Sequence, residues 1–283
     1  MKQAVLVHYY SGHLFFTAAA LFLLVVLLDV TGVSRGNAAG RRITGFVALL
    51  ALALGAMGAP PMPLYLWVPV AIATAACVVA GFGEKRRPFT GIAAAVAVIV
   101  AVALEVPYHV DPTGIRRPKH LMVMGDSLSS GGFGEKTIWH QRMGDMAVTN
   151  LALPSDGVRE ALEHQAPMLL PPGNEQVVLI EIGGNDMLEG TPPDAFAKAL
   201  DGLARAARRN GRKVVMLELP LLPGAWRYGL AQRQVARRHG VALIPKRLLA
   251  AVLLDPLDTS DGLHLTDRGH AALANGIRAS LGW

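Results

Sequence analysis

The chain has 283 residues, of which 52% are hydrophobic and only 17% are charged, whereas soluble domains contain about 25% charged residues. Its single cysteine, Cys77, excludes an intramolecular disulfide and argues against a cysteine-based metal or redox site. The net charge of +6 comes with no nucleic-acid-binding motif, so we expect no nucleic-acid partner. The apolar excess is confined to roughly the first 110 residues, which predicts a membrane region followed by a globular domain.

Four apolar runs in the first part each approach the length of about 20 residues that crosses a bilayer as a helix. A cleaved signal peptide has one apolar region of about 7–15 residues, so it could account for the first run only. We therefore predict that residues 1–110 form an all-α region of four transmembrane helices. The expected spans cover residues 12–31, 43–59, 64–83 and 89–107.

Basic residues between the runs predict the orientation of these spans. They stand in the first and third loops, whereas the Pro60–Pro63 turn between the second and third runs has none. The positive-inside rule then places the N-terminus, the Pro60–Pro63 turn and everything after the fourth span outside a bacterial inner or plasma membrane. The basic loop residues are Arg35, Arg41, Arg42, Lys85, Arg86 and Arg87.

Residues 111–118 are rich in proline, glycine and charge, and they predict a linker. In residues 119–283, short aliphatic runs alternate with helical patterns, which predicts an α/β domain with a five-stranded parallel sheet and helices on both faces. The expected strands are 120–124, 147–151, 176–182, 213–219 and 241–244. The expected helices are 136–145, 157–168, 193–209, 225–238 and 266–281.

Polar segments stand where several of these strands end, and ligands of open parallel sheets bind outside those ends. The segment "GDS" (125–127) follows the first strand, "NLALPSDG" (150–157) overlaps the end of the second, and "GGND" (183–186) follows the third. A fourth segment, "DTSDGLH" (258–264), precedes the last helix. Chain order alone thus offers a serine, an amide and then an aspartate–histidine pair.

These residue types suit nucleophilic catalysis. A serine hydroxyl such as that of Ser127 becomes a good nucleophile when a base removes its proton, and the base needs a carboxylate that orients it. Asp261 and His264 are three residues apart and can meet at a helix entry. The side-chain amide of Asn185 is suited to stabilising an oxyanion. A metal site at Asp261, His264 and His270 would need further ligands, and the sequence shows no evident ones. We therefore predict neither a metal nor a cofactor.

Together these segments resemble the SGNH or GDSL hydrolase family across about residues 119–283. "GDSL" (125–128) matches the nucleophile block, "GGND" the block with the oxyanion asparagine, and "DGLH" (261–264) the Asp-x-x-His block. The subgroup most similar to this chain contains thioesterase I, arylesterase and lysophospholipase enzymes. The resemblance implies a three-layer, flavodoxin-like fold, a serine nucleophile and no cofactor.

By this resemblance Ser127 is the nucleophile, His264 the general base and then acid, and Asp261 its orienting carboxylate. Asn185 and the backbone N–H of Ser127 would bind the oxyanion. Other residues of the matching blocks would support these groups, namely Gly125, Asp126, Gly183, Gly184 and Asp186.

One position departs from the family pattern. The family's second block places an oxyanion glycine about five residues after an asparagine, and counting from Asn150 leads to Ser155, with Gly157 two residues later. A serine keeps the backbone N–H that donates to the oxyanion, so the expected third donor is Ser155.

We therefore predict a membrane-anchored serine esterase that cleaves an acyl or acetyl ester of an envelope glycan or lipid outside the membrane. Its expected partners are the lipid bilayer and this acylated substrate. Three alternatives remain open: an acyltransferase to a polysaccharide hydroxyl, an acyl thioesterase or lysophospholipase, and a catalytically silent glycan-binding module. The sequence predicts neither the acyl length nor the oligomeric state.

Overall fold

The structure is a computed structural model that describes residues 2–32, 38–58, 60–82, 88–171 and 176–283. The chain divides into two compact units. One contains residues 12–107, and the other contains residues 1–11 together with residues 108–283. Residues 1–11, which the sequence analysis assigned to the membrane region, thus belong to the globular unit.

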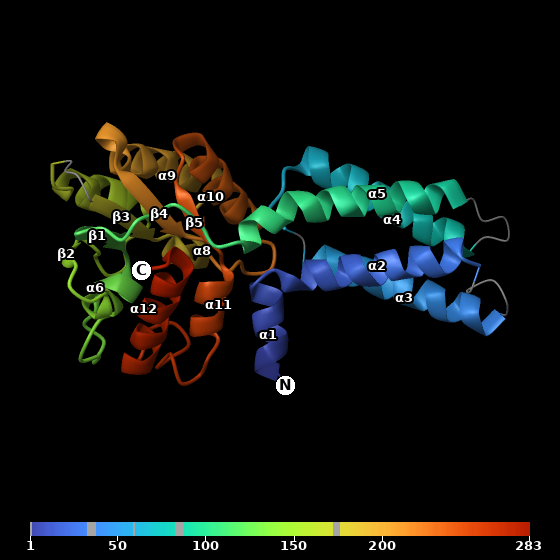
Figure 1. The fold of residues 1–283 in the computed structure, drawn as a ribbon, viewed down its shortest axis with the longest axis horizontal. Helices are drawn as coiled ribbons and strands as arrows, with labels where there is room; N and C mark the ends of the chain where they lie inside the picture. The colour runs from blue at the N-terminus through green and yellow to red at the C-terminus, as the bar shows by residue number, and fades with distance from the viewer. Residues whose placement is uncertain (1, 33–37, 59, 83–87, 172–175) are drawn as a thin grey trace. The chain divides into compact units, whose positions relative to one another are not determined.

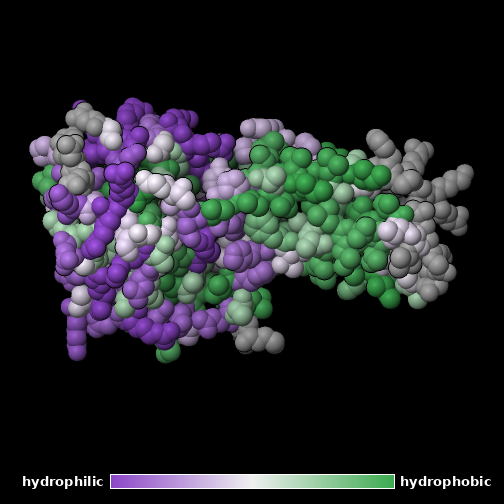
Figure 2. All heavy atoms as spheres, viewed as in Figure 1, coloured by the Kyte–Doolittle hydropathy of each residue, from purple (hydrophilic) through white to green (hydrophobic). Residues whose placement is uncertain are grey.

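The unit of residues 12–107 consists of four helices, seen at the blue and teal end of the ribbon in Figure 1. Apolar and small side chains such as Phe22, Ala48 and Ala94 pack between the helices. Its outer surface is also apolar: Figure 2 shows it predominantly green, and Phe46 is 67% exposed. The helices are α2 (His13–Val30), α3 (Ala38–Met57), α4 (Leu64–Phe82) and α5 (Pro88–Glu105).

Two segments of the described chain are long and apolar enough to cross a membrane, namely His13–Val30 and Gly91–His109. The second and third expected spans coincide with shorter apolar helices, Arg42–Met57 and Leu64–Val78. The helical region is therefore present, but the expected number of four spans is not confirmed. Of the basic residues that predicted the orientation, Arg35, Lys85, Arg86 and Arg87 lie outside the described residues.

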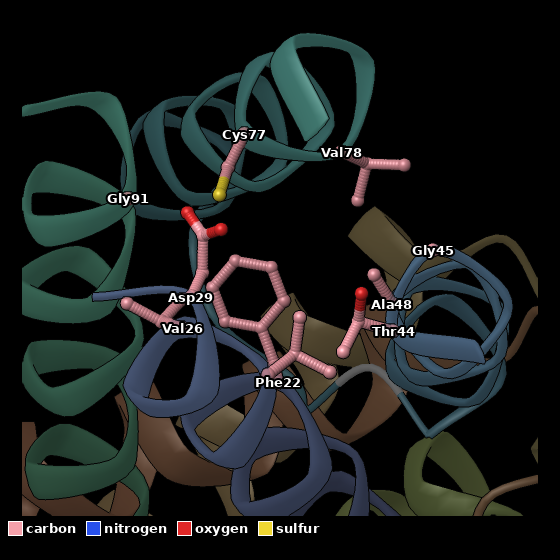
Figure 3. A pocket seen from close by; sticks show the side chains of 10 residues that line it. Phe22, Val26, Asp29, Thr44, Gly45, Ala48, Cys77, Val78 and Gly91 are labelled. Carbon is pink, nitrogen blue, oxygen red and sulfur yellow. The ribbon is translucent and has the colours of Figure 1, made fainter. Parts of the chain in front are cut away.

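A small pocket of about 40 Å³ lies among these helices (Figure 3). Asp29 lines it from α2, Thr44 from α3 and Cys77 from α4, and the Asp29 carboxylate points toward the Cys77 sulfur. Cys77 is partly buried, as expected for a thiol that packs between helices.

The globular unit is built on a five-stranded parallel sheet with strand order β2-β1-β3-β4-β5. This confirms the expected α/β fold and strand number. Alternate residues of the central strands point to opposite faces, so that Met122 and Leu121 of β1 enter different cores. The strands are β1 (His120–Gly125), β2 (Ala147–Asn150), β3 (Gln176–Glu181), β4 (Lys213–Leu217) and β5 (Ala242–Ile244).

Helices cover both faces of this sheet and make three layers (Figure 1). On one face, α9 (Pro193–Ala207) and α10 (Trp226–His239) bury residues such as Leu200 and Val235. On the other face, α11 (Arg247–Leu253) and α12 (Asp267–Leu281) bury residues such as Leu249. Because both faces are covered, the sheet directs ligands to the edge at its carboxyl ends.

One expected helix is wrong, and a second differs in type. Within residues 136–145 there is one 3₁₀ turn, η3 (Trp139–Arg142), and the N–H groups of Lys136 and Thr137 before it donate to the Asp267 carboxylate. The expected helix 157–168 is present as a continuous helical segment over residues 158–168, but its type changes along the chain. The segment consists of α7 (Val158–Glu160), a π-helical stretch η4 (Ala161–Gln165) and a 3₁₀ turn η5 (Ala166–Met168).

Candidate active site

Ser127 lies where β1 gives way to the short helix α6 (Ser127–Ser130). The preceding residue, Asp126, caps this turn, because its Oδ1 accepts a hydrogen bond from the Leu128 N–H at 3.0 Å. Ser127 is half-buried and lines a cavity. The turn therefore holds a serine hydroxyl at the carboxyl edge of the sheet, where ligands of such sheets bind.

Gly125 makes this turn possible because β1 and β3 approach closely at their ends. A Cβ atom on Gly125 would lie 2.7 Å from the Glu181 carbonyl oxygen and 2.9 Å from Ser129 Cβ. The Gln165 side chain also holds this glycine: Oε1 accepts from the Gly125 N–H at 3.0 Å, and Nε2 donates to its carbonyl at 2.8 Å. Gln165 could not be predicted as a site residue, because nothing in its local sequence marks such a long-range contact.

A buried chain of hydrogen bonds supports the same turn from inside. Ser129 Oγ donates to Glu181 Oε2 at 2.7 Å and accepts from Trp139 Nε1 at 3.0 Å. Burial and the nearby Asp126 raise the pKa of Glu181 well above its usual range. Burial also raises the pKa of Asp126 to about 6. Glu181 was not predicted as a site residue, although an acidic residue in the apolar run "VVLIEI" was a signal.

Asp261 and His264 form a tight pair. Asp261 Oδ2 lies 2.6 Å from His264 Nδ1, while Asp261 Oδ1 accepts from the backbone N–H groups of His264 at 2.7 Å and Leu263 at 2.9 Å. These hydrogen bonds hold the pKa of Asp261 well below its usual range, and the bond from the His264 backbone N–H has the largest effect. An ionised carboxylate on Nδ1 favours the tautomer that leaves Nε2 as the proton acceptor.

Phe133 packs on the imidazole ring of His264. The two ring centroids are 3.9 Å apart, and the ring planes are 18° from parallel. Phe133 comes from a glycine-rich turn in which the Glu135 carboxylate accepts from the Phe133 N–H at 2.8 Å. The ring of His264 is thus held both by Asp261 at its edge and by Phe133 on its face.

Asn185 lies in the first turn of the short helix α8 (Gly184–Glu189) and lines the same cavity as Ser127. Its Nδ2 donates to the Asp156 carbonyl at 3.0 Å. The residue before α8, Gly183, has φ 109°, and a Cβ there would lie 2.9 Å from the Phe196 ring. Glycine is therefore required at the turn that presents the Asn185 amide.

Ser155 is the one non-glycine residue of the described chain with a positive φ, at 64°. Gly157 has φ −88°, but a Cβ there would lie 2.8 Å from Glu160 Oε2 and 3.0 Å from Asp186 Oδ2. Asp186 fixes this segment because its Oδ2 accepts from the Val158 N–H at 2.8 Å. Ser155 thus adopts the left-handed conformation that suits glycine, whereas Gly157 occupies the position where a side chain would clash with its neighbours.

One cavity of about 190 Å³ brings several of these segments together. Ser127 and Asn185 line it, as does the Gly262–Leu263 turn between Asp261 and His264. Ser155 is not among the residues that line it. Within the described chain Ser127 Oγ makes no hydrogen bond to His264; such catalytic bonds often form only when substrate is bound.

The described residues contain no cluster of three or more His, Cys, Asp and Glu side chains arranged to hold a metal ion. His270, which sequence reasoning considered as a metal ligand beside Asp261 and His264, is buried, and its Nδ1 accepts from the Trp139 N–H at 3.3 Å. His270 therefore supports the loop that carries Trp139.

The family comparison matches residues 123–272, just over half of the chain, to the GDSL-like lipase/acylhydrolase family. Among curated proteins, the chain is 32% identical over 165 residues to the esterase TesA of Pseudomonas aeruginosa, covering 54% of this chain and 80% of that protein. It is 28% identical over 161 residues to the arylesterase of Vibrio mimicus, covering 51% of this chain and 78% of that protein.

Among solved structures, the globular part resembles the psychrotrophic esterase EstA from Pseudoalteromonas sp., with a TM-score of 0.51 and 19% sequence identity. This match covers 57% of the present chain and 96% of that protein, and at this identity it supports the fold alone.

Proposed function

The chain belongs to the GDSL-like lipase/acylhydrolase family and is an ester-hydrolysing enzyme, and from this premise we propose that it is a membrane-anchored serine esterase with Ser127 as its nucleophile. The observation that carries this proposal is the cavity that Ser127 and Asn185 share with the turn leading into His264.

In the proposed reaction, Ser127 Oγ attacks the ester carbonyl carbon while its proton passes to His264 Nε2. Asp261 keeps the imidazole oriented and stabilises the imidazolium. The tetrahedral intermediate collapses, the C–O bond breaks, and the leaving alcohol takes the proton from His264. Water then repeats the sequence on the acyl-serine, releasing the carboxylic acid and restoring the Ser127 hydroxyl.

The oxyanion that forms at each addition needs donors that are already in place. The Asn185 amide and the Ser127 backbone N–H are the proposed donors, with the Ser155 backbone N–H as the third. Asn185 Nδ2 is held by the Asp156 carbonyl, one residue after Ser155, so these two candidate donors are linked through the same turn.

The helical unit supports membrane attachment, since two of its segments have the length and apolarity of a membrane span. With the loop charges of the sequence, this favours a catalytic unit outside the membrane that cleaves an acyl ester of an envelope glycan or lipid. A reaction in the envelope needs no cofactor, because the three side chains supply the nucleophile, the base and its orientation.

The Ser127→Ala variant tests the proposal. We expect kcat/KM for p-nitrophenyl butyrate to fall by at least about 10³-fold, because the acyl-serine can no longer form. A fluorophosphonate probe should label the parent protein at residue 127 and leave the variant unlabelled. Ser130→Ala is the matched control, since Ser130 lies in the same helix but is bonded only weakly, to the Gly131 carbonyl at 3.4 Å.

A Ser127→Ala protein that hydrolyses the ester as fast as the parent would overturn the assignment. Loss of activity in Ser130→Ala to the same degree would point to a disturbed turn instead of a lost nucleophile. The thermal unfolding midpoint of both variants, measured in the same detergent, separates these outcomes.

A further inference from the structure

The cavity beside Ser127 is lined mostly by aliphatic side chains. Leu219 comes from the loop after β4, and Leu249 and Leu253 come from α11. Leucines at its edge are exposed to solvent: Leu188 is 52%, Leu222 37% and Leu263 40% exposed. An apolar cavity with an apolar rim beside a nucleophile is suited to a hydrocarbon chain and not to sugar hydroxyls, which need polar partners.

Two carboxyl groups, those of Asp126 and Glu181, also line this cavity. Both are buried, and burial raises the pKa of each, which favours the uncharged form of the carboxyl group. One Glu181 oxygen is already engaged by the Ser129 hydroxyl. Burial thus reduces the charge that these two carboxyl groups bring to the cavity.

One wall of the cavity comes from outside the region that matches the family. Tyr10 lines it from the last position of α1 (Lys2–Tyr10), and α1 packs on α11. The Tyr10 ring is half-buried and lies edge-on to the Tyr9 ring, with centroids 5.0 Å apart. The end of the helix is closed by Ser11, whose backbone N–H donates to the Val7 carbonyl and whose hydroxyl donates to the His8 carbonyl.

We propose that Tyr10 is a specificity-determining residue, which completes an acyl-chain pocket and makes the enzyme prefer esters of medium-length apolar acids over acetate esters. This inference rests on the proposed function, because it takes Ser127 as the site of acylation. It adds that the N-terminal helix, more than 100 residues before the family region, takes part in substrate selection.

The size of the cavity sets the chain length. An apolar cavity of about 150 Å³ holds a benzene molecule, and this cavity is somewhat larger, at about 190 Å³. An acyl chain of about six to eight carbons would fill it, whereas an acetyl group would leave most of the leucine surface without contact.

The experiment compares kcat/KM for p-nitrophenyl acetate and p-nitrophenyl octanoate, using the full chain in detergent. We expect the parent to prefer the octanoate, and Tyr10→Ala to lower the octanoate-to-acetate ratio about tenfold through loss of apolar contact. Tyr10→Phe should retain the parent ratio, because the ring and not the hydroxyl forms the wall. Val5→Ala is the matched control on α1, where Val5 is 63% exposed and does not line the cavity.

A double-mutant cycle tests whether Tyr10 acts through the bound chain. Leu253→Ala on α11 should also lower the ratio, and the double variant should lose less than the product of the two single losses, because both side chains contact one acyl chain. An unchanged octanoate-to-acetate ratio in Tyr10→Ala would overturn the proposal. A fall in kcat/KM that is equal for both esters, and that Val5→Ala also shows, would overturn it as well. Either result leaves the proposed function standing if Ser127→Ala is inactive, whereas an active Ser127→Ala protein refutes that function itself.

Discussion

Ser155 holds a left-handed backbone conformation, with φ 64°, which costs an L-residue with a side chain roughly 1–2 kcal/mol. Its neighbour Asp156 gives its carbonyl to the Asn185 amide and its Oδ2 to the Gln165 amide at 2.9 Å. Without these bonds, Ser155 would relax to a more favourable backbone conformation. The strain is therefore maintained by bonds that tie the Ser155 turn to Asn185, another of the proposed oxyanion donors.

We expect Ser155→Gly to be neutral or to stabilise the protein by up to about 1 kcal/mol, because relief of strain is offset in part by the greater freedom of glycine in the unfolded chain. Esterase activity should be retained, since glycine keeps the backbone N–H. Ser155→Val should instead destabilise the protein and lower kcat, because a β-branched residue resists this conformation. The unfolding midpoint and kcat of both variants check this, and an active, fully stable Ser155→Val protein would contradict it.

At the scale of elements, the joined ends of β1 and β3 carry a buried acidic pair, Asp126 and Glu181. The pKa of Asp126 is about 6 in the folded protein against 3.8 for the free side chain. The folded state therefore binds more protons than the unfolded state between these values, and the contribution of Asp126 to stability falls as the pH rises through this window. The strand junction is less stable at neutral pH than at mildly acidic pH for this reason.

Asp126→Asn removes this dependence, while the amide oxygen can still accept from the Leu128 N–H. The stability difference between Asp126→Asn and the parent should grow in favour of the variant by about 1–2 kcal/mol from pH 5 to pH 8. Unfolding of both proteins in the same detergent at the two pH values measures it. A difference that stays constant, or that shrinks as the pH rises, would show that Asp126 does not titrate as described.

The strands of the sheet could be predicted from the sequence because alternate residues of β1, β3 and β4 enter the two cores. The helices beside the site could not. The segment 136–145 is tied to the start of α12, where the Asp267 carboxylate accepts from the N–H groups of Lys136 and Thr137. The one-turn helix α6 is too short for a periodic pattern. Both are fixed by contacts between residues far apart in the chain.

At the scale of the whole molecule, three of the four short motifs found in the sequence contribute residues to the cavity, whereas the segment 150–157 does not line it. The side chains that support them were not predictable, because Gln165 reaches Gly125 across 40 residues and Tyr10 reaches the cavity from the other end of the chain. A motif specifies the groups that react, whereas the walls of a pocket depend on packing that local sequence does not encode.

The membrane topology is the remaining property of the whole molecule, and cysteine labelling can decide it. Four spans place both the start of α4 and the catalytic unit outside the membrane, whereas two spans, at His13–Val30 and Gly91–His109, place α4 inside and the catalytic unit outside. The background is Cys77→Ala, which removes the single native cysteine. The probes are Tyr65→Cys, at a side chain 75% exposed, and Arg159→Cys, at one 74% exposed.

We expect a small membrane-impermeant maleimide to label both probe cysteines in intact cells, as four spans and an outer catalytic unit require. Labelling of Arg159→Cys alone, with Tyr65→Cys reached only after permeabilisation, would establish two spans. Protection of Arg159→Cys in intact cells would reverse the orientation and remove the envelope ester as a substrate. Esterase activity of each cysteine variant in membranes is the control that the protein is folded, since an unfolded chain would expose both sites regardless of topology.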